Sequence, residues 1–227
     1  MKRERKFEGF SKDSIAFLRK LKANNNKQWF ESHKKDYENY LLLPLKNLVT
    51  DVGEIMLSID SDFEISPAVN KTISRVYRDT RFSHDKSPYK ISHWITFKKP
   101  RKDWKDAPAY FFEISPDSYR YGMGFYGAAP DTMAKFRELI DEKPKEFQKA
   151  ISFYAKQKTF VLEGEKYKKI FDEAKSEEIQ NWYQRKNFYL VCNRKIDDIL
   201  FSEKLANSLI SDFGSLADFY HFLLQIK

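Results

Sequence analysis

The chain has 227 residues, 41% hydrophobic and 33% charged, a composition that favours one substantial folded core and excludes a disordered chain. Its 41 lysines and arginines outnumber 33 aspartates and glutamates, and the net charge of +8 favours anionic partners without choosing between metabolites and nucleic acid. A single cysteine, Cys192, excludes an internal disulfide, and no apolar run is long enough for a membrane span or secretion signal, so we expect a cytoplasmic single domain over residues 1–227.

The first sixty residues have the spacing of amphipathic helices. Ser11 is placed to cap a first helix, and the asparagines at 24–26 supply its end and a new cap. Apolar residues then recur at steps of three and four over residues 29–59, which predicts a long helical segment. Pro44 predicts a kink or a new helix, because proline lacks a backbone donor and clashes with the preceding turn.

Beyond residue 60 the pattern changes to that of strands. Runs rich in aromatic and β-branched residues predict an antiparallel sheet from residues 73–78, 89–97, 108–114 and 119–125. Residues 98–106, with several basic side chains, are typical of an exposed hairpin tip.

Helical spacing returns after Pro130 and again after Pro144, followed by a strand-like run at 188–192 and two closing helices separated by Gly214. Helices before and after a block of strands predict an α+β fold, because α/β folds alternate the two. We expect an antiparallel or mixed central sheet flanked by N-terminal and C-terminal helices.

The most unusual segment is residues 75–90, which reads RVYRDTRFSHDKSPYK. Guanidinium groups donate paired hydrogen bonds to phosphate or carboxylate, and a loop can fold several of them around one ligand. We therefore expect a pocket for an anionic small molecule. The candidate ligand-binding residues are Arg75, Arg78, Asp79, Arg81, Lys86, Tyr89 and Glu113.

Three segments carry a family resemblance: FLRKLKANNNKQWF at 17–30, the 75–90 segment, and YGMGFY at 121–126. Together they resemble the domain of unknown function 2461 family over nearly the whole chain. The resemblance implies one compact α+β domain and carries no activity, cofactor or ligand with it. It also implies a third glycine where this chain has Met123, a side chain expected to narrow an opening to a ligand.

Two alternatives to the anion pocket stay open. One is a nucleic-acid-associated protein, because aromatic and basic residues of the 98–106 tip suit stacking and phosphate contact. Those residues are Lys98, Lys99, Arg101, Lys102, Trp104 and Lys105. The other is a purely structural role, in which Asp79 and Asp85 pair with the arginines of the loop.

The residues leave open whether any reaction is catalysed, which cofactor would serve it and which oligomer forms. The histidines lack the spacing of a metal site, and none is predicted. His84, beside Asp85, is the histidine placed for acid or base chemistry, whereas His93 is expected in the sheet or core. Cys192 lies in an apolar run, where a thiol packs as a small hydrophobe.

Overall fold

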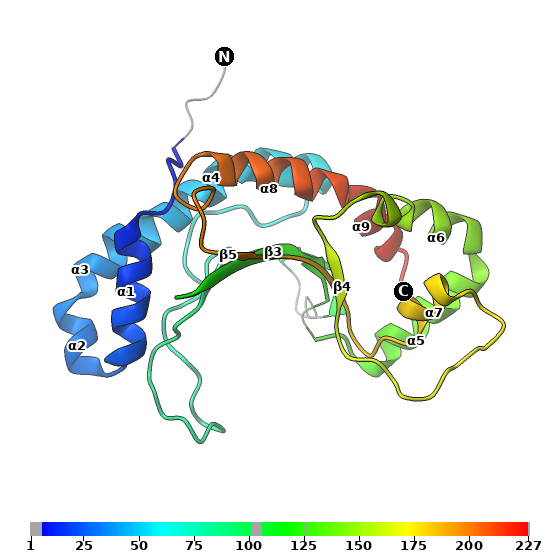
Figure 1. Ribbon diagram of the computed structural model, residues 1–227, viewed down its shortest axis with the longest axis horizontal. Helices are drawn as coiled ribbons and strands as arrows, with labels where there is room; N and C mark the ends of the chain where they lie inside the picture. Colours follow the sequence, from blue (N-terminus) through cyan, green and yellow to red (C-terminus); the bar gives the residue numbers. More distant parts are fainter. Residues whose placement is uncertain (1–5, 101–105, 126, 227) are drawn as a thin grey trace, which may run out of the picture.

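The computed structural model describes residues 6–100, 106–125 and 127–226, and at its centre lies a curved antiparallel sheet (Figure 1). The strand order is β1-β2-β3-β5-β4, and every neighbouring pair is antiparallel. The strands are β1 (His93–Phe97), β2 (Ala109–Ile114), β3 (Ser118–Gly124), β4 (Val161–Glu163) and β5 (Tyr189–Lys195). The α+β prediction is confirmed, with a sheet that is antiparallel throughout.

Helices precede, interrupt and follow the strands. The N-terminal helices are α1 (Lys12–Ala23), α2 (Lys27–Ser32), α3 (Lys34–Tyr37), the π-helix η1 (Glu38–Leu42) and α4 (Leu43–Ile59). The later helices are α5 (Pro130–Glu142), α6 (Pro144–Ile151), the 3-10 helix η3 (Tyr154–Lys156), α7 (Glu177–Tyr183), α8 (Lys204–Ser215) and α9 (Ala217–Leu223).

The predicted N-terminal helix signals are confirmed. The Ser11 side chain accepts from the backbone N–H of Ser14, whose own side chain accepts from the backbone N–H of Ser11, and the Asn26 side chain accepts from the backbone N–H of Trp29 at the start of α2.

Pro44 lies in the first turn of α4, which follows the π-helix η1 directly, because Leu42 and Leu43 keep helical backbone angles. The carbonyl oxygen of Tyr40, four residues before the proline, accepts from the hydroxyl of Ser14 at 2.5 Å. The proline therefore marks the boundary between η1 and α4.

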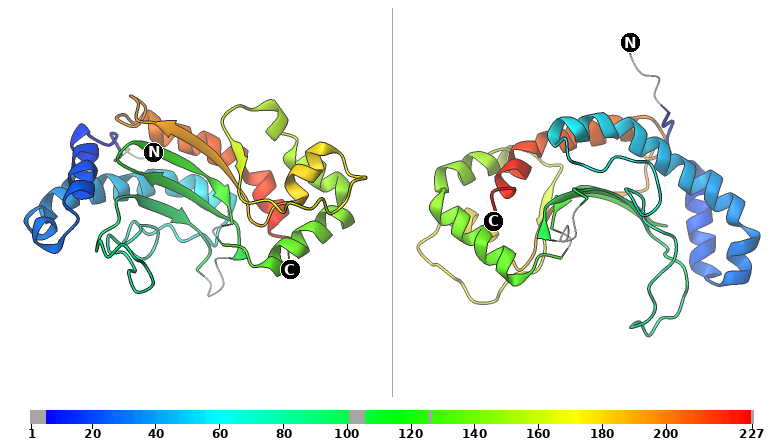
Figure 2. Two further views of the ribbon diagram at one scale, coloured as in Figure 1. Left: turned by 60° about the horizontal axis from the view of Figure 1, so that its bottom comes forward. Right: turned by 180° about the vertical axis from the view of Figure 1, so that it is seen from behind.

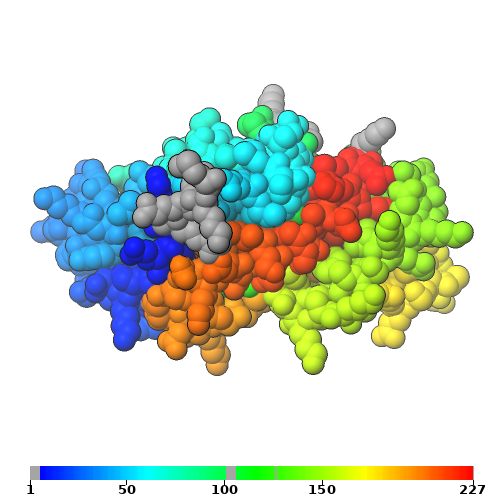
Figure 3. Space-filling model, turned by 90° about the horizontal axis from the view of Figure 1, so that it is seen from above, coloured from blue at the N-terminus to red at the C-terminus, as the bar shows by residue number. Residues whose placement is uncertain are grey.

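The sheet is covered on its convex face. Helices α4 and α8 run side by side over it, as the view from above shows (Figure 3). None of the helices in the described residues lies over the concave face, whereas α1–α3 stand beyond one end of the strands and α5–α7 beyond the other (Figures 1 and 2). The molecule is thus an arch with a sheet as its inner surface.

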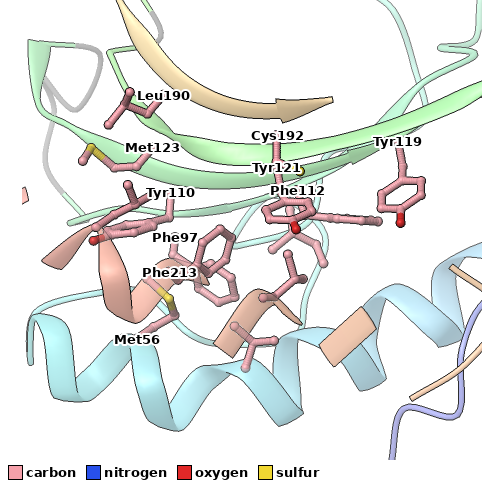
Figure 4. Close-up of a cluster of buried hydrophobic side chains, with 14 of the residues drawn as sticks. Met56, Phe97, Tyr110, Phe112, Tyr119, Tyr121, Met123, Leu190, Cys192 and Phe213 are labelled. Atoms are coloured by element: carbon pink, nitrogen blue, oxygen red, sulfur yellow. The ribbon is translucent and has the colours of Figure 1, made fainter. Parts of the chain in front are cut away.

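The core fills the space between the convex face and its two helices (Figure 4). Alternate residues of each strand point to this side, because successive side chains of a strand face opposite ways. Met56 of α4 and Phe213 of α8 meet the strand residues there, and both are fully buried. Their strand neighbours in the cluster include Phe97, Tyr110, Phe112, Tyr121, Met123 and Cys192.

Residues 73–78 do not form a sheet strand, and that prediction was wrong. The strand-like pairing of this segment consists of isolated bridges that pair Ile73 with Val69 and Ile95, and Tyr77 with Tyr89. Separate backbone hydrogen bonds, from Ser74 to Trp94, from Arg78 to Pro88 and from Lys90 to Val76, hold the segment, which continues into an irregular hairpin. The break between the closing helices was also misplaced, because α8 continues through Gly214 and ends at Ser215.

The glycines of β3 serve the sheet itself. A Cβ at Gly122 would lie 1.9 Å from the carbonyl oxygen of Leu190, and one at Gly124 would lie 2.4 Å from that of Phe188. Because neither glycine has a Cβ atom, β3 can approach β5 closely. Met123 points into the core with 0% exposure, so the expectation that it narrows an opening to a ligand was wrong.

Candidate anion site

Residues 75–90, called the arginine hairpin from here on, project from one end of the sheet beside α1–α3 (Figure 1). Two ion pairs fasten it: Arg78 with Asp85, and Arg81 with Asp79 at 2.7 Å. Lys86 adds a bond from Nζ to the carbonyl oxygen of Thr80 at 3.0 Å. These charged side chains hold the tip, while backbone hydrogen bonds from Arg78 to Pro88 and from Lys90 to Val76 join the two arms of the hairpin.

Local donors also lower the pKa of both hairpin carboxyls. The side chain and backbone of Ser87, and then Arg78, hold the pKa of Asp85 well below its usual range. The side chain and backbone of Arg81 lower the pKa of Asp79 to about 2. Both carboxylates are ionised at neutral pH, so the charges of Arg78 and Arg81 are already compensated.

A hollow of about 590 Å³ lies between the arginine hairpin and the end of α1. Asn25 fixes this arrangement, because its side-chain amide donates to the carbonyl of Tyr89 at 2.9 Å and accepts from the N–H of Tyr89 at 3.0 Å. We call it the Lys90 hollow. Its lining includes Lys22, Asn25, Arg78, Asp79, Asp85, Ser87, Tyr89, Lys90 and Trp94.

Lys90 is the distinctive charge of this hollow. Its half-buried ammonium lies 4.2 Å from the centre of the Trp94 ring, and burial followed by the positive charge of Arg75 lowers its pKa. Within residues 6–100, 106–125 and 127–226, no carboxylate forms an ion pair with Lys90 or Arg75. Lys90 is thus a half-buried cation without an ion-pair partner among these residues, whereas the exposed Arg75 repels it and attracts the carboxylate of Asp79, which lines the same hollow.

The predicted site residues are only partly brought together. Arg78, Asp79 and Tyr89 line the Lys90 hollow, and Arg75 is exposed but near enough to repel Lys90. Three others lie elsewhere. Arg81 and Lys86 belong to the exposed tip of the hairpin, and Glu113 pairs with Arg120 on the concave face of the sheet at 2.7 Å.

Sequence reasoning missed Lys90 as a site residue, and with it Lys22, Asn25 and Trp94. For Lys90 a local signal existed, because it ends the cationic segment directly after Tyr89. For Asn25 there was none, since its partner Tyr89 is 64 residues away.

The candidates for acid, base or nucleophile chemistry lie outside the hollow. His93 is fully buried on the convex side of β1, as expected, and His84 is exposed in the hairpin. Cys192 is buried in the core, where burial raises the pKa of its thiol. Among the described residues, no cluster of His, Cys, Asp and Glu could hold a metal ion.

Most of the basic tip that was predicted to contact nucleic acid lies outside the described residues, namely Arg101, Lys102, Trp104 and Lys105. Lys99, at the start of that segment, has a structural role. Its ammonium binds Asp60 at 2.8 Å and Asp62 at 3.2 Å, which fastens the end of α4 to the chain after β1.

Fold and site together define an α+β protein whose arched antiparallel sheet has a cation-lined hollow at one end. The family model described as "Conserved hypothetical protein (DUF2461)" matches residues 13–222, and the chain belongs to this family, as its resemblance implied. No curated protein matches the chain. None of the described helices has both the length and the apolar character needed to cross a bilayer.

Proposed function

We propose that the protein binds an anionic small molecule, with a phosphate or carboxylate group, in the Lys90 hollow. The observation that carries the proposal is the uncompensated position of Lys90, half-buried against Trp94 and beside Arg75. A partly desolvated cation without a partner is unfavourable, and an anionic ligand would supply the missing charge. A titratable group whose pKa is shifted by its surroundings in a concave site is also more often functional than one on open surface.

The roles of the hollow's other polar groups follow from their present partners. Arg78 keeps Asp85 and positions the hairpin, while Lys22 stands at the rim with Asp117 at 3.7 Å as its distant, exposed partner. Asn25 and Tyr89 set the width of the hollow by their paired hydrogen bonds. Arg78 is therefore structural in this proposal, Arg81 stays with Asp79 at the exposed tip, and Lys90 with Arg75 attracts the ligand.

A titration with pyrophosphate, followed by calorimetry and by thermal unfolding, tests the proposal. Lys90→Gln removes the uncompensated charge and should abolish binding, whereas Lys86→Gln, at the exposed hairpin tip, should leave it unchanged. A ligand at a hundredfold excess over its Kd should raise the free energy of unfolding by about 2.7 kcal/mol. Wild-type protein that shows no binding to pyrophosphate, phosphate or citrate at millimolar concentration would overturn the proposal.

A further inference from the structure

The concave face of the sheet carries a pattern that anion binding in the hollow does not explain. Phe111 of β2 and Tyr189 of β5 both point to this side and are partly exposed, with ring centroids 6.4 Å apart. Between their strands runs β3, whose Gly122 and Gly124 present no side chain to the same face. The two rings meet edge to face, at 90° to each other, over these glycines, so the middle of the concave face is a shallow floor that carries an aromatic pair.

Cations border this floor at the end where the hollow lies. Register places Trp94, Glu113, Arg120 and Asn193 opposite one another across four strands, and Lys195 follows on the same side. Glu113 neutralises Arg120, and Asn193 donates to Glu163 at 2.6 Å. In the part of the chain that the structure describes, Lys195 and Lys90 have no ionic partner, and with Arg120 they outnumber the carboxylates of Glu113 and Glu163, so this border carries net positive charge.

Shape and charge restrict what can occupy the face. A flat bilayer cannot reach the floor of an arch whose two ends are flanked by α1–α3 and α5–α7 (Figure 2). A second copy of a chain with net charge +8 would bring like charges together at the cationic border. An extended anionic polymer lying across the strands meets neither obstacle.

We propose that the concave face binds single-stranded nucleic acid, whose bases stack on Phe111 and Tyr189 and whose phosphates contact Lys90 and Lys195. Open sheet faces with exposed aromatic rings accept unpaired bases, because every base has a flat π-face and flanking cations track the backbone. A polypeptide of acidic residues would satisfy the cations but has no planar groups for the rings. Base-paired strands hide the faces that the rings would contact.

Fluorescence polarisation measures this binding with a labelled oligothymidylate of about 15 nucleotides at roughly 50 mM and 200 mM salt. We expect the single strand to bind more tightly than a duplex of equal length or than polyglutamate of equal charge. Phe111→Leu and Tyr189→Leu should each weaken binding roughly fivefold or more, because they keep apolar volume but remove a stacking ring. Tyr40→Leu, which removes an exposed ring from η1, is the matched control and should change nothing.

Lys90→Gln should reduce the slope of the logarithm of affinity against the logarithm of salt concentration by about one, because one phosphate contact is lost. Absence of binding at low salt, equal affinity for duplex or polyglutamate, or no effect of both leucine variants would each overturn the inference. Circular-dichroism melting confirms that the variants are folded. Pyrophosphate binding should need Lys90 but neither Phe111 nor Tyr189. The two measurements therefore distinguish a failure of the proposed anion binding in the Lys90 hollow from a failure of the proposed nucleic-acid binding on the concave face.

Discussion

The hydroxyl of Tyr220 donates to Oδ2 of Asp60 at 2.7 Å and thereby joins α9 to the end of α4. The ammonium of Lys99 contacts the same oxygen at 2.8 Å, and the Asp60 side chain is only 8% exposed. A carboxylate so nearly buried is stable only with good partners. Three segments far apart in the sequence therefore depend on one charge.

The stability of the fold should consequently depend on pH through Asp60. Burial raises its pKa, but hydrogen bonds from Lys99, the backbone of Asp62 and Tyr220 outweigh burial and leave the pKa below its ordinary value. A carboxyl with a lowered folded pKa stabilises above its unfolded pKa of about 3.9, and this contribution is lost as pH falls through the folded pKa. We expect Asp60→Asn to lower the free energy of unfolding by about 3 kcal/mol at pH 7.

Urea denaturation at a series of pH values checks this, because the gap between wild type and Asp60→Asn should close below about pH 4. Asp62→Asn is the matched control: its side chain is 70% exposed and contacts only the outer side of Lys99. It should have a small effect at every pH. A constant gap down to pH 3 would contradict the assignment to Asp60.

The close approach of β3 to β5 predicts that Gly122 tolerates no side chain. In Gly122→Ala the new Cβ would lie 1.9 Å from a backbone oxygen, which cannot move without breaking the ladder. We expect a loss of roughly 3 kcal/mol or more in the free energy of unfolding. Denaturation by urea measures it, and wild-type stability in this variant would contradict the strand spacing.

Gly53→Ala is the matched control within α4. Its Cβ would meet Ile65 at an ordinary 3.5 Å, and alanine is the better residue inside a helix. This substitution should raise the free energy of unfolding by about 0.5–1 kcal/mol. The same substitution, glycine to alanine, should therefore lower the free energy of unfolding at Gly122 and raise it at Gly53.

Much of this architecture could be predicted because its signals are local. Ser11 and Asn26 predict helix starts because their side chains can cap the first turn. In β2 and β3, the alternation of buried and exposed residues indicates strands that have one face in the core. Residues 73–78 share the composition of strands but lack a ladder partner beyond isolated bridges. Composition reports how well a residue suits a sheet, whereas pairing depends on the rest of the fold.

The site was harder to predict, for a physical reason. The arginine spacing correctly marked a charged hairpin, but it could not tell which cations would be neutralised. Asp79 and Asp85 pair with Arg81 and Arg78, which leaves Lys90 and Arg75 without an ion pair among the described residues. That outcome depends on Asn25 and Trp94, which approach only after folding.

The exposed pair of Arg81 and Asp79 makes a further prediction possible. Were the carboxylate buried, Arg81→Ala would destabilise the protein, as a structural role for this arginine implied. The side chains are 77% and 43% exposed, and solvent screens the pair. We expect Arg81→Ala to leave the urea midpoint within experimental error and to preserve pyrophosphate binding, and loss of either would contradict its position at the tip.

His93 should make the protein sensitive to mild acid. Its ring is fully buried 5.8 Å from that of Tyr37, and neither ring nitrogen has a partner with hydrogen-bond geometry among the described residues. Burial, and then the charge of Lys90, lowers the pKa of His93 to about 3; the nearby backbone of Lys90 offsets part of this effect. Between about pH 6.5 and 3 the unfolded chain therefore binds a proton that the folded chain does not bind, and the free energy of unfolding falls by roughly 1.4 kcal/mol for each pH unit of acidification.

His93→Phe should remove this slope between about pH 6.5 and 4.5, where most carboxyls remain ionised. It should keep or raise stability at pH 7, because no buried nitrogen is left unpaired. His84→Gln, in the exposed hairpin, should retain the slope, and parallel curves for wild type and His93→Phe would show that His93 titrates freely with solvent.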